Sequence, residues 1–121
     1  MAKIHIKESE IQRVILDYLQ IQENMGKLMF QRSNSLNVAT KSGHYIKTGK
    51  KGSPDILVWV NKIFCDGDYY IEFAKTLALE VKSEIGKLSD NQKIWKDKFE
   101  KLGGEYFVVR SLEDVIKILE G

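Results

Sequence analysis

The chain has 121 residues, 43% of them apolar and 30% charged, which suits one globular domain with a single core. Its 19 Lys and Arg against 17 Asp and Glu leave a net charge of only +2, so total charge alone does not indicate a nucleic-acid-binding protein. The single cysteine, Cys65, excludes an internal disulfide framework and a cysteine-rich zinc site. Because there is neither a signal-peptide pattern nor an apolar run of the roughly 20 residues that span a membrane, we expect one domain, residues 1–121, in a reducing cytoplasm.

The first third of the chain predicts a helix and then a strand. Apolar residues recur at helical spacing between Glu8 and Met25, and Ser9 with Gln12 resembles a capping box at the start. Leu28 to Arg32 is typical of a short strand. The polar stretch from Ser33 to Gly43 is expected to be an exposed connection.

The middle of the chain predicts two strands joined by a tight turn. Asp55 to Val60 is rich in branched and aromatic residues, and Asp66-Gly67-Asp68 is a turn signal. An extended stretch runs from Tyr69 to about Ser83.

The last third predicts helix, strand, helix. Ser89 or Asp90 is expected to cap a helix that ends before Gly103, and Tyr106 to Val109 forms a short apolar strand. Ser111 is expected to cap a final helix that runs through Leu119. This order predicts an α/β fold with a mixed central β-sheet flanked by helices.

The informative constellation is Asp55 at the start of one predicted strand and Glu80-Val81-Lys82 at the end of another. Because side chains alternate along a strand, Glu80 and Lys82 share one face while Val81 points into the core. Taken alone, Glu80 and Lys82 favour a solvated ion pair. If Asp55 opens a neighbouring strand, however, two carboxylates converge, and a hard divalent cation such as Mg²⁺ or Mn²⁺ would hold them together, with the Val81 carbonyl as a further ligand.

A lysine beside such a metal site has a defined use. Lys82 can orient a metal-bound water or stabilise charge that grows on a phosphate, while the metal lowers the pKa of the water. The combination predicts hydrolysis of a phosphodiester.

These residues resemble the PD-(D/E)xK nuclease superfamily, and the wider pattern is similar to its VRR-NUC branch of virus-type replication-repair nucleases. The motifs that carry the resemblance are Gly52-Ser53-Pro54-Asp55, Glu80-Val81-Lys82-Ser83, Gly86-Lys87-Leu88-Ser89 with Gln92, and Val109-Arg110-Ser111. The resemblance implies a restriction-endonuclease-like core in which Asp55 and Glu80 bind the metal, Lys82 is the catalytic lysine and Gln92 lies near the active site. It also implies a glutamate on the first helix, for which Glu8 fits the spacing better and Glu10 is the rival.

The basic residues between the first and second predicted strands are candidates for phosphate contacts, although lysines on a solvated loop are common in proteins that bind no nucleic acid. The basic stretch consists of Lys41, Lys47, Lys50 and Lys51, and Arg32 and the neutral Asn34, which are nearby in sequence, are candidates with it. We expect them to recognise the shape of DNA, because no element resembles a groove-reading helix. Gly43 to Lys50 has the wrong spacing for a phosphate-binding loop, so no nucleotide cofactor is expected. Trp59 and Trp95 are expected in the core, and base-stacking platforms are the less favoured alternative.

The segment from Val60 to Leu77 is longer than the short hairpin of the family. Its apolar and aromatic residues either complete the core or form a surface for a second copy of the chain. The resemblance implies a homodimer whose two active sites cut branched DNA, such as a four-way junction or a flap, in replication, recombination or repair. The alternatives are a nuclease that acts on plain duplex DNA and a binding module on the same fold that cuts nothing.

Overall fold

The computed structural model describes residues 6–33, 37–39, 41–42, 45–47 and 50–120. Along the chain lie α1 (Glu8–Asn24), β1 (Leu28–Arg32), β2 (Asn37–Ala39), β3 (Tyr45–Lys47), β4 (Ile56–Asp66), β5 (Tyr69–Val81), α2 (Asp90–Lys101), β6 (Glu105–Val109) and α3 (Leu112–Glu120). Asn34 and parts of the segment from Gly43 to Lys50 lie outside the described residues. None of the helices in the described part of the chain has the length and apolar character needed to cross a membrane.

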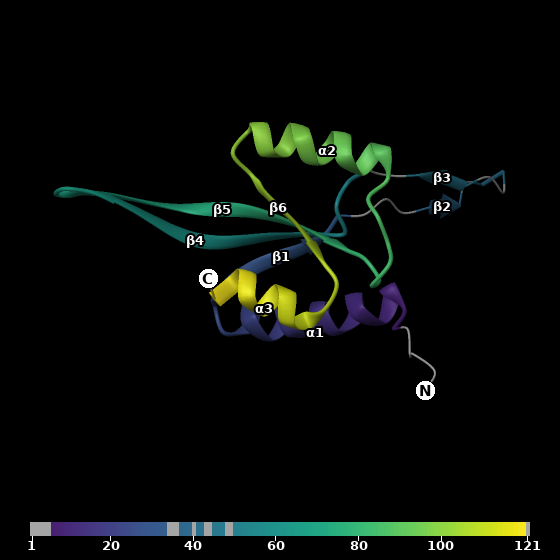
Figure 1. Cartoon of the computed structure of the whole chain (residues 1–121), viewed down its shortest axis with the longest axis horizontal. Helices are drawn as coiled ribbons and strands as arrows, with labels where there is room; N and C mark the ends of the chain where they lie inside the picture. Colours follow the sequence, from purple (N-terminus) through teal and green to yellow (C-terminus); the bar gives the residue numbers. More distant parts are fainter. Residues whose placement is uncertain (1–5, 34–36, 40, 43–44, 48–49, 121) are drawn as a thin grey trace.

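Four strands form the central sheet in the order β1-β4-β5-β6 (Figure 1). The pairs β1–β4 and β4–β5 are antiparallel, and β5–β6 is parallel, because α2 carries the chain back across the sheet before β6 begins. The sheet is therefore mixed. The predicted α/β class with flanking helices is confirmed.

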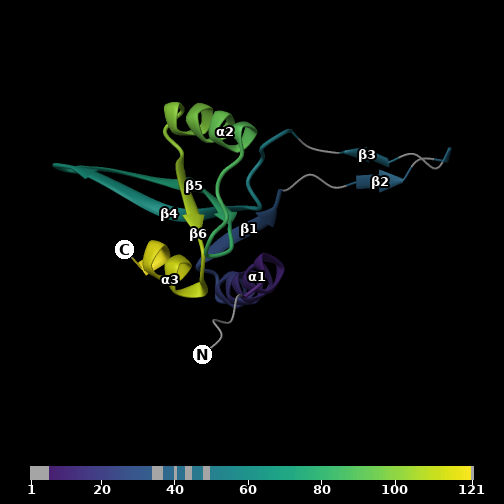
Figure 2. The same ribbon diagram turned by 45° about the vertical axis from the view of Figure 1, so that its right-hand side comes forward.

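The helices cover both faces of this sheet (Figures 1 and 2). Helices α1 and α3 lie together on one face, and α2 lies on the other. The α1–α3 face holds the main core, whose fully buried members include Ile15, Leu19, Ile56, Val58, Leu79, Val81, Val109 and Val115. Helix α2, in contrast, has no fully buried residue. The two layers therefore differ: one is a packed core, and the other is a partly open face.

The β4–β5 hairpin is much longer than the sheet it belongs to and projects from the body of the protein (Figure 1). Its two strands pair from Ile56 with Leu79 out to Asp66 with Tyr69, and Gly67 takes a φ of 61° in the turn. Every residue from 61 to 74 is exposed. The interpretation that this segment completes the core is therefore wrong, because the hairpin extends beyond the helices that could cover it.

Two other expectations need correction. Helix α1 begins at Glu8 after Lys7, without a side-chain cap, so Ser9 and Gln12 do not form the expected capping box. Neither Trp59 nor Trp95 belongs to the core: both are half-buried, because they lie on partly open surfaces of the sheet and of α2.

The predicted connection from Ser33 to Gly43 contains a strand that was not expected. It contains β2, which pairs with β3 in a second, short antiparallel hairpin. This hairpin extends away from the central sheet in both views (Figures 1 and 2).

Candidate active site

Asp55 and Glu80 face each other across two neighbouring strands. The β4–β5 register pairs Ile56 with Leu79, so the next position places Asp55 opposite Glu80. Residues directly opposite on antiparallel strands project from the same face, with Cβ atoms about 5 Å apart. That face is the one covered by α2, while the neighbours Ile56 and Leu79 point into the core.

The backbone around Asp55 is held in place by several hydrogen bonds. The Asp55 carboxylate accepts one from the Val81 N–H at 2.8 Å, and the Asp55 carbonyl accepts one from the Ser33 N–H at 3.0 Å. The Ser33 hydroxyl donates to the Pro54 carbonyl at 2.9 Å. Asp55 is thus fixed before any ligand binds.

Glu80 is 2% exposed, so the interpretation of a solvated ion pair on the sheet face is wrong. Burial, a hydrogen bond to Asp55 and the negative charge of Asp55 together raise the pKa of Glu80 to about 9, against an opposing effect of Lys82. At neutral pH the Glu80 carboxyl group therefore holds a proton. A divalent cation, which prefers carboxylate oxygens, could replace that proton, so the donor set fits Mg²⁺ or Mn²⁺.

Gln92 contacts Glu80 from the first turn of α2. Its side-chain Oε1 accepts a hydrogen bond from the Ser89 N–H at 2.8 Å, and the Gln92 N–H binds the Ser89 hydroxyl at 3.2 Å, which completes a capping box. Its Nε2 is left to donate to Glu80 Oε1 at 3.1 Å. The same side chain therefore caps the helix and orients the buried acid.

Lys82 follows Glu80 on the same face and is half-buried. Its N–H donates to the Val109 carbonyl at 3.0 Å, and the chain then folds back over its side chain, so that a methyl group added at Gly86 would lie 3.4 Å from Lys82 Cβ and Cδ. Arg110 holds this loop, because its Nη1 donates to the Ser83 carbonyl at 2.5 Å and to the Gly86 carbonyl at 2.8 Å.

Glu8 lies at the first turn of α1 and is close enough for its charge to raise the pKa of Glu80, an effect that Glu10 does not have. Among the residues that the structure describes, no three His, Cys, Asp or Glu side chains come together as a metal site. The acidic centre here is thus the pair Asp55 and Glu80, with Glu8 as an outer charge. A catalytic role for Glu8 stays a prediction.

Tyr106 belongs to the site and was missed by the sequence analysis. Tyr106 lies on β6 and pairs with Ala78 of β5. Because Ala78 and Glu80 are two residues apart on β5, Tyr106 shares the α2 face with Glu80. It is 7% exposed, its hydroxyl has no hydrogen-bond partner, and burial together with the charges of Glu80 and Asp55 raises its pKa well above the usual value. No signal in the sequence identified it, because it belongs to an apolar strand segment.

The predicted phosphate-binding residues fall into two groups. Arg32, Lys50 and Lys51 are exposed around the loop that leads into Asp55, while Lys41 and Lys47 belong to the β2–β3 hairpin region. Asn34 lies outside the described residues. The phosphate contacts stay a prediction, as does the Val81 carbonyl as a metal ligand.

A mixed sheet with helices on both faces and a pair of acids with a lysine at the ends of its central strands defines a nuclease-like α/β core. The model of the VRR-NUC domain family matches residues 5–113, which is nearly the whole chain, and the chain belongs to this family. Membership indicates a nuclease that acts on DNA. Searches of curated proteins and of solved structures found no match.

Proposed function

We propose that this protein is a metal-dependent endonuclease that hydrolyses phosphodiester bonds in branched DNA. The observation that carries the proposal is the pairing of Asp55 with Glu80 on the α2 face, with Lys82 on the same strand end. Two carboxylates and an ammonium group at one place are an unfavourable arrangement for stability alone, because the buried acids repel each other. They suit a site that exchanges a proton for a cation.

Each residue has a role in this proposal. Asp55 and Glu80 would hold Mg²⁺ or Mn²⁺, which when bound supplies a water of lowered pKa and stabilises charge on the phosphate. Lys82 offers an ammonium group to the attacking water or to the scissile phosphate. Gln92 keeps the Glu80 carboxylate in a single orientation by its hydrogen bond.

Exposed basic residues near Asp55 support the proposed binding of DNA. Arg32 pairs with Ile56, next to Asp55, and Lys50 and Lys51 lie in the loop that leads into Asp55. A basic surface of this kind attracts the phosphate backbone without reading bases.

A homodimer is part of the proposal, because the β4–β5 hairpin carries exposed apolar side chains away from the sheet. They are Ile63, Phe64, Tyr69, Tyr70, Ile71 and Phe73, all at least 45% exposed. A second copy of the chain would bury them and bring two active sites onto one junction.

The test is cleavage of labelled linear, flap, splayed and four-way DNA with and without Mg²⁺. We expect metal-dependent cutting of the branched substrates, loss of cutting in Lys82→Ala and Asp55→Asn, and retention in Asp66→Asn, which changes an exposed aspartate at the other end of β4. Cutting of linear duplex alone would overturn the substrate preference. Metal-dependent binding without any cutting would favour a binding module, and wild-type activity in Lys82→Ala would refute the assigned site.

A further inference from the structure

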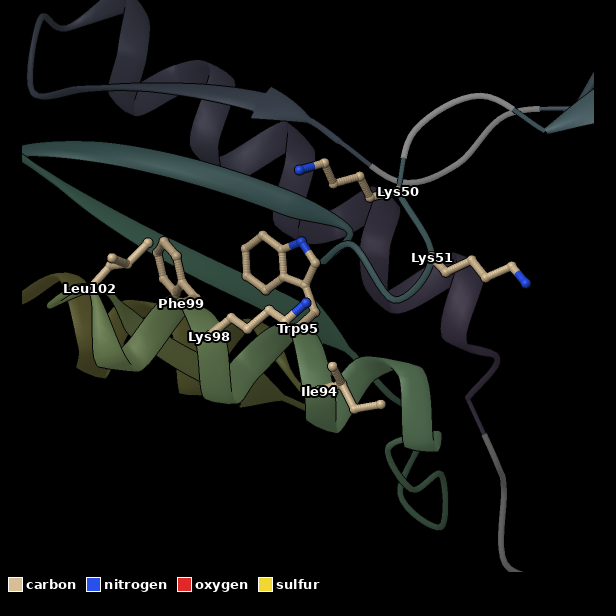
Figure 3. Close-up of a pocket in the computed structure, with 7 residues that line it drawn as sticks. All are labelled: Lys50, Lys51, Ile94, Trp95, Lys98, Phe99 and Leu102. Carbon is tan, nitrogen blue, oxygen red and sulfur yellow. The ribbon is translucent and has the colours of Figure 1, made fainter.

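A pocket of about 420 Å³ lies between α2 and the loop that leads to Asp55, outside the acid pair (Figure 3). Four of its lining residues are aromatic or aliphatic, Ile94, Trp95, Phe99 and Leu102. The other three are lysines, Lys50, Lys51 and Lys98. The volume falls within the range of about 300–1,000 Å³ that is typical of small-molecule sites. Neither Asp55 nor Glu80 lines this pocket.

The aromatic rings are held in place from below. The Trp95 ring lies 4.9 Å from the Phe99 ring and 6.0 Å from the buried Tyr106 ring, measured between centroids. In Figure 3 the side chains of Lys50 and Lys98 reach toward the two sides of the Trp95 indole, while Lys51 points away. A supported aromatic ring between ammonium groups suits a flat, aromatic ligand that carries negative charge.

The pocket neighbours the proposed active site along α2. Trp95 follows Gln92 by one helical turn, and Gln92 contacts Glu80. The loop before Asp55 touches the same helix, because a Cβ at Gly52 would lie 2.2 Å from the Asn91 carbonyl oxygen. The pocket and the acid pair are therefore neighbours, joined by the first turn of α2 and by the loop before Asp55.

We propose that the pocket is a subsite for one unpaired nucleotide of the DNA substrate, next to the phosphate that is cut. Its base stacks on Trp95, and Lys50 and Lys98 contact the flanking phosphates. This inference rests on the proposed function, since it assigns a part of the same substrate. It supplies a physical reason for selecting branched DNA: fully paired duplex has no base to place here, whereas a flap or splayed end has one.

The chain contains only two tryptophans, which makes the test specific. In EDTA, so that no cleavage occurs, single-stranded oligothymidylate is added to Trp59→Phe, which leaves Trp95 as the sole indole. We expect its fluorescence to be quenched by stacking, and no quenching in Trp95→Phe, whose remaining Trp59 lines a different hollow with Met29 and Ala74. Absence of quenching in Trp59→Phe at saturating oligonucleotide would overturn the proposal.

Affinity gives the second readout. Trp95→Ala should bind oligothymidylate about 5- to 100-fold more weakly, with Trp95→Phe close to wild type, because stacking on an aromatic ring is lost only in the former. Binding of a covalently closed circular duplex, which has no unpaired base, should be unchanged. An equal loss on both DNAs, or no loss on either, would overturn the subsite.

Charge reversal separates the lysines from the ring. Lys98→Glu should weaken oligothymidylate binding more than Lys117→Glu, which makes the same charge change on α3, across the sheet from the pocket. Equal effects would reduce the role of Lys98 to net charge and contradict the proposed contact. If Trp95 fluorescence responds to protein concentration but not to oligonucleotide, a second copy fills the pocket and the proposal is wrong.

The two proposals fail in distinguishable ways. A chain that binds neither the closed circular duplex nor oligothymidylate contradicts the proposed function itself. A chain that binds and cuts DNA without any quenching of Trp95 fluorescence contradicts only the subsite.

Discussion

Gln92 donates its side-chain amide to the Glu80 carboxyl at 3.1 Å while its amide oxygen is occupied by the Ser89 N–H. This double use determines which end of the amide faces the acid. The hydrogen-bond donor must point at Glu80, because the acceptor is consumed by the helix cap. The orientation of a buried carboxyl group thus depends on the start of a helix that is not itself buried.

The first prediction separates capping from orientation. Gln92→Glu retains a group that can complete the capping box but removes the donor to Glu80, so cleavage should fall about 10- to 100-fold with little change in stability. Ser89→Ala removes the cap and should cost about 1 kcal/mol of unfolding free energy. Chemical denaturation and cleavage rates on one DNA substrate measure both. Equal activity of Gln92→Glu and wild type would contradict the role of the hydrogen bond.

The second prediction concerns pH. Because the pKa of Glu80 rises from an ordinary 4.5 to about 9 on folding, the folded protein holds a proton that the unfolded chain has lost. The contribution of Glu80 to stability is therefore fully present below about pH 4.5 and declines as pH rises toward about 9. In EDTA, the Tm of wild type should fall across this window more than that of Glu80→Gln. Parallel curves for the two proteins would contradict it.

The third prediction adds the metal. Since a cation must displace the proton on Glu80, the rise in Tm caused by Mg²⁺ should grow as pH increases from 6 to 9. Asp55→Asn should abolish the rise, and Glu72→Gln, an exposed glutamate on the same strand as Glu80, should leave it unchanged. Differential scanning fluorimetry with and without Mg²⁺ measures the shifts. A rise that does not depend on Asp55 would place the cation elsewhere.

The fourth prediction tests the close approach of the Asp55 loop to α2. Gly52 and Gly67 both have positive φ, 78° and 61°, so alanine strains the backbone at either position by about 1–3 kcal/mol. Only at Gly52 would the new Cβ meet backbone, at 2.2 Å from the Asn91 carbonyl oxygen, whereas Gly67 has open space. Gly52→Ala should therefore lose cleavage activity, and Gly67→Ala should lose only stability. Comparable activities in the two variants would show that the contact does not align the site.

The fifth prediction tests the loop clamp at Arg110. Arg110→Ala frees the loop over Lys82 and should lower kcat while KM for DNA changes little, because the loop positions Lys82 without contacting the substrate. Unfolding free energy should fall by about 1.5–3 kcal/mol, as for other hydrogen bonds from charged groups. The exposed Arg13 on α1 provides the control, Arg13→Ala. A change confined to KM would assign Arg110 to DNA binding.

The sequence alone determined most of the architecture. The periodicity of apolar residues predicted the helices and strands, with β1 and the start of β6 within a residue of the observed bounds, because local hydrophobic patterning and turn residues act over short distances. The residue types of Asp55, Glu80 and Lys82 predicted hydrolysis of a phosphodiester, and the family match indicates a nuclease; the roles of these three residues stay predictions.

Only the tertiary structure decided what surrounds those residues. The burial of Glu80 depends on α2 lying over its face of the sheet. The position of Tyr106 on the same face depends on the pairing of β6 with β5. The half-buried position of Trp95 depends on which face of α2 the sheet leaves uncovered. The apolar residues of the β4–β5 hairpin likewise suggest a part of the core, yet the hairpin projects because no helix covers it (Figure 1). Burial and proximity arise from contacts between segments that are far apart in the chain, and local patterning carries no record of them.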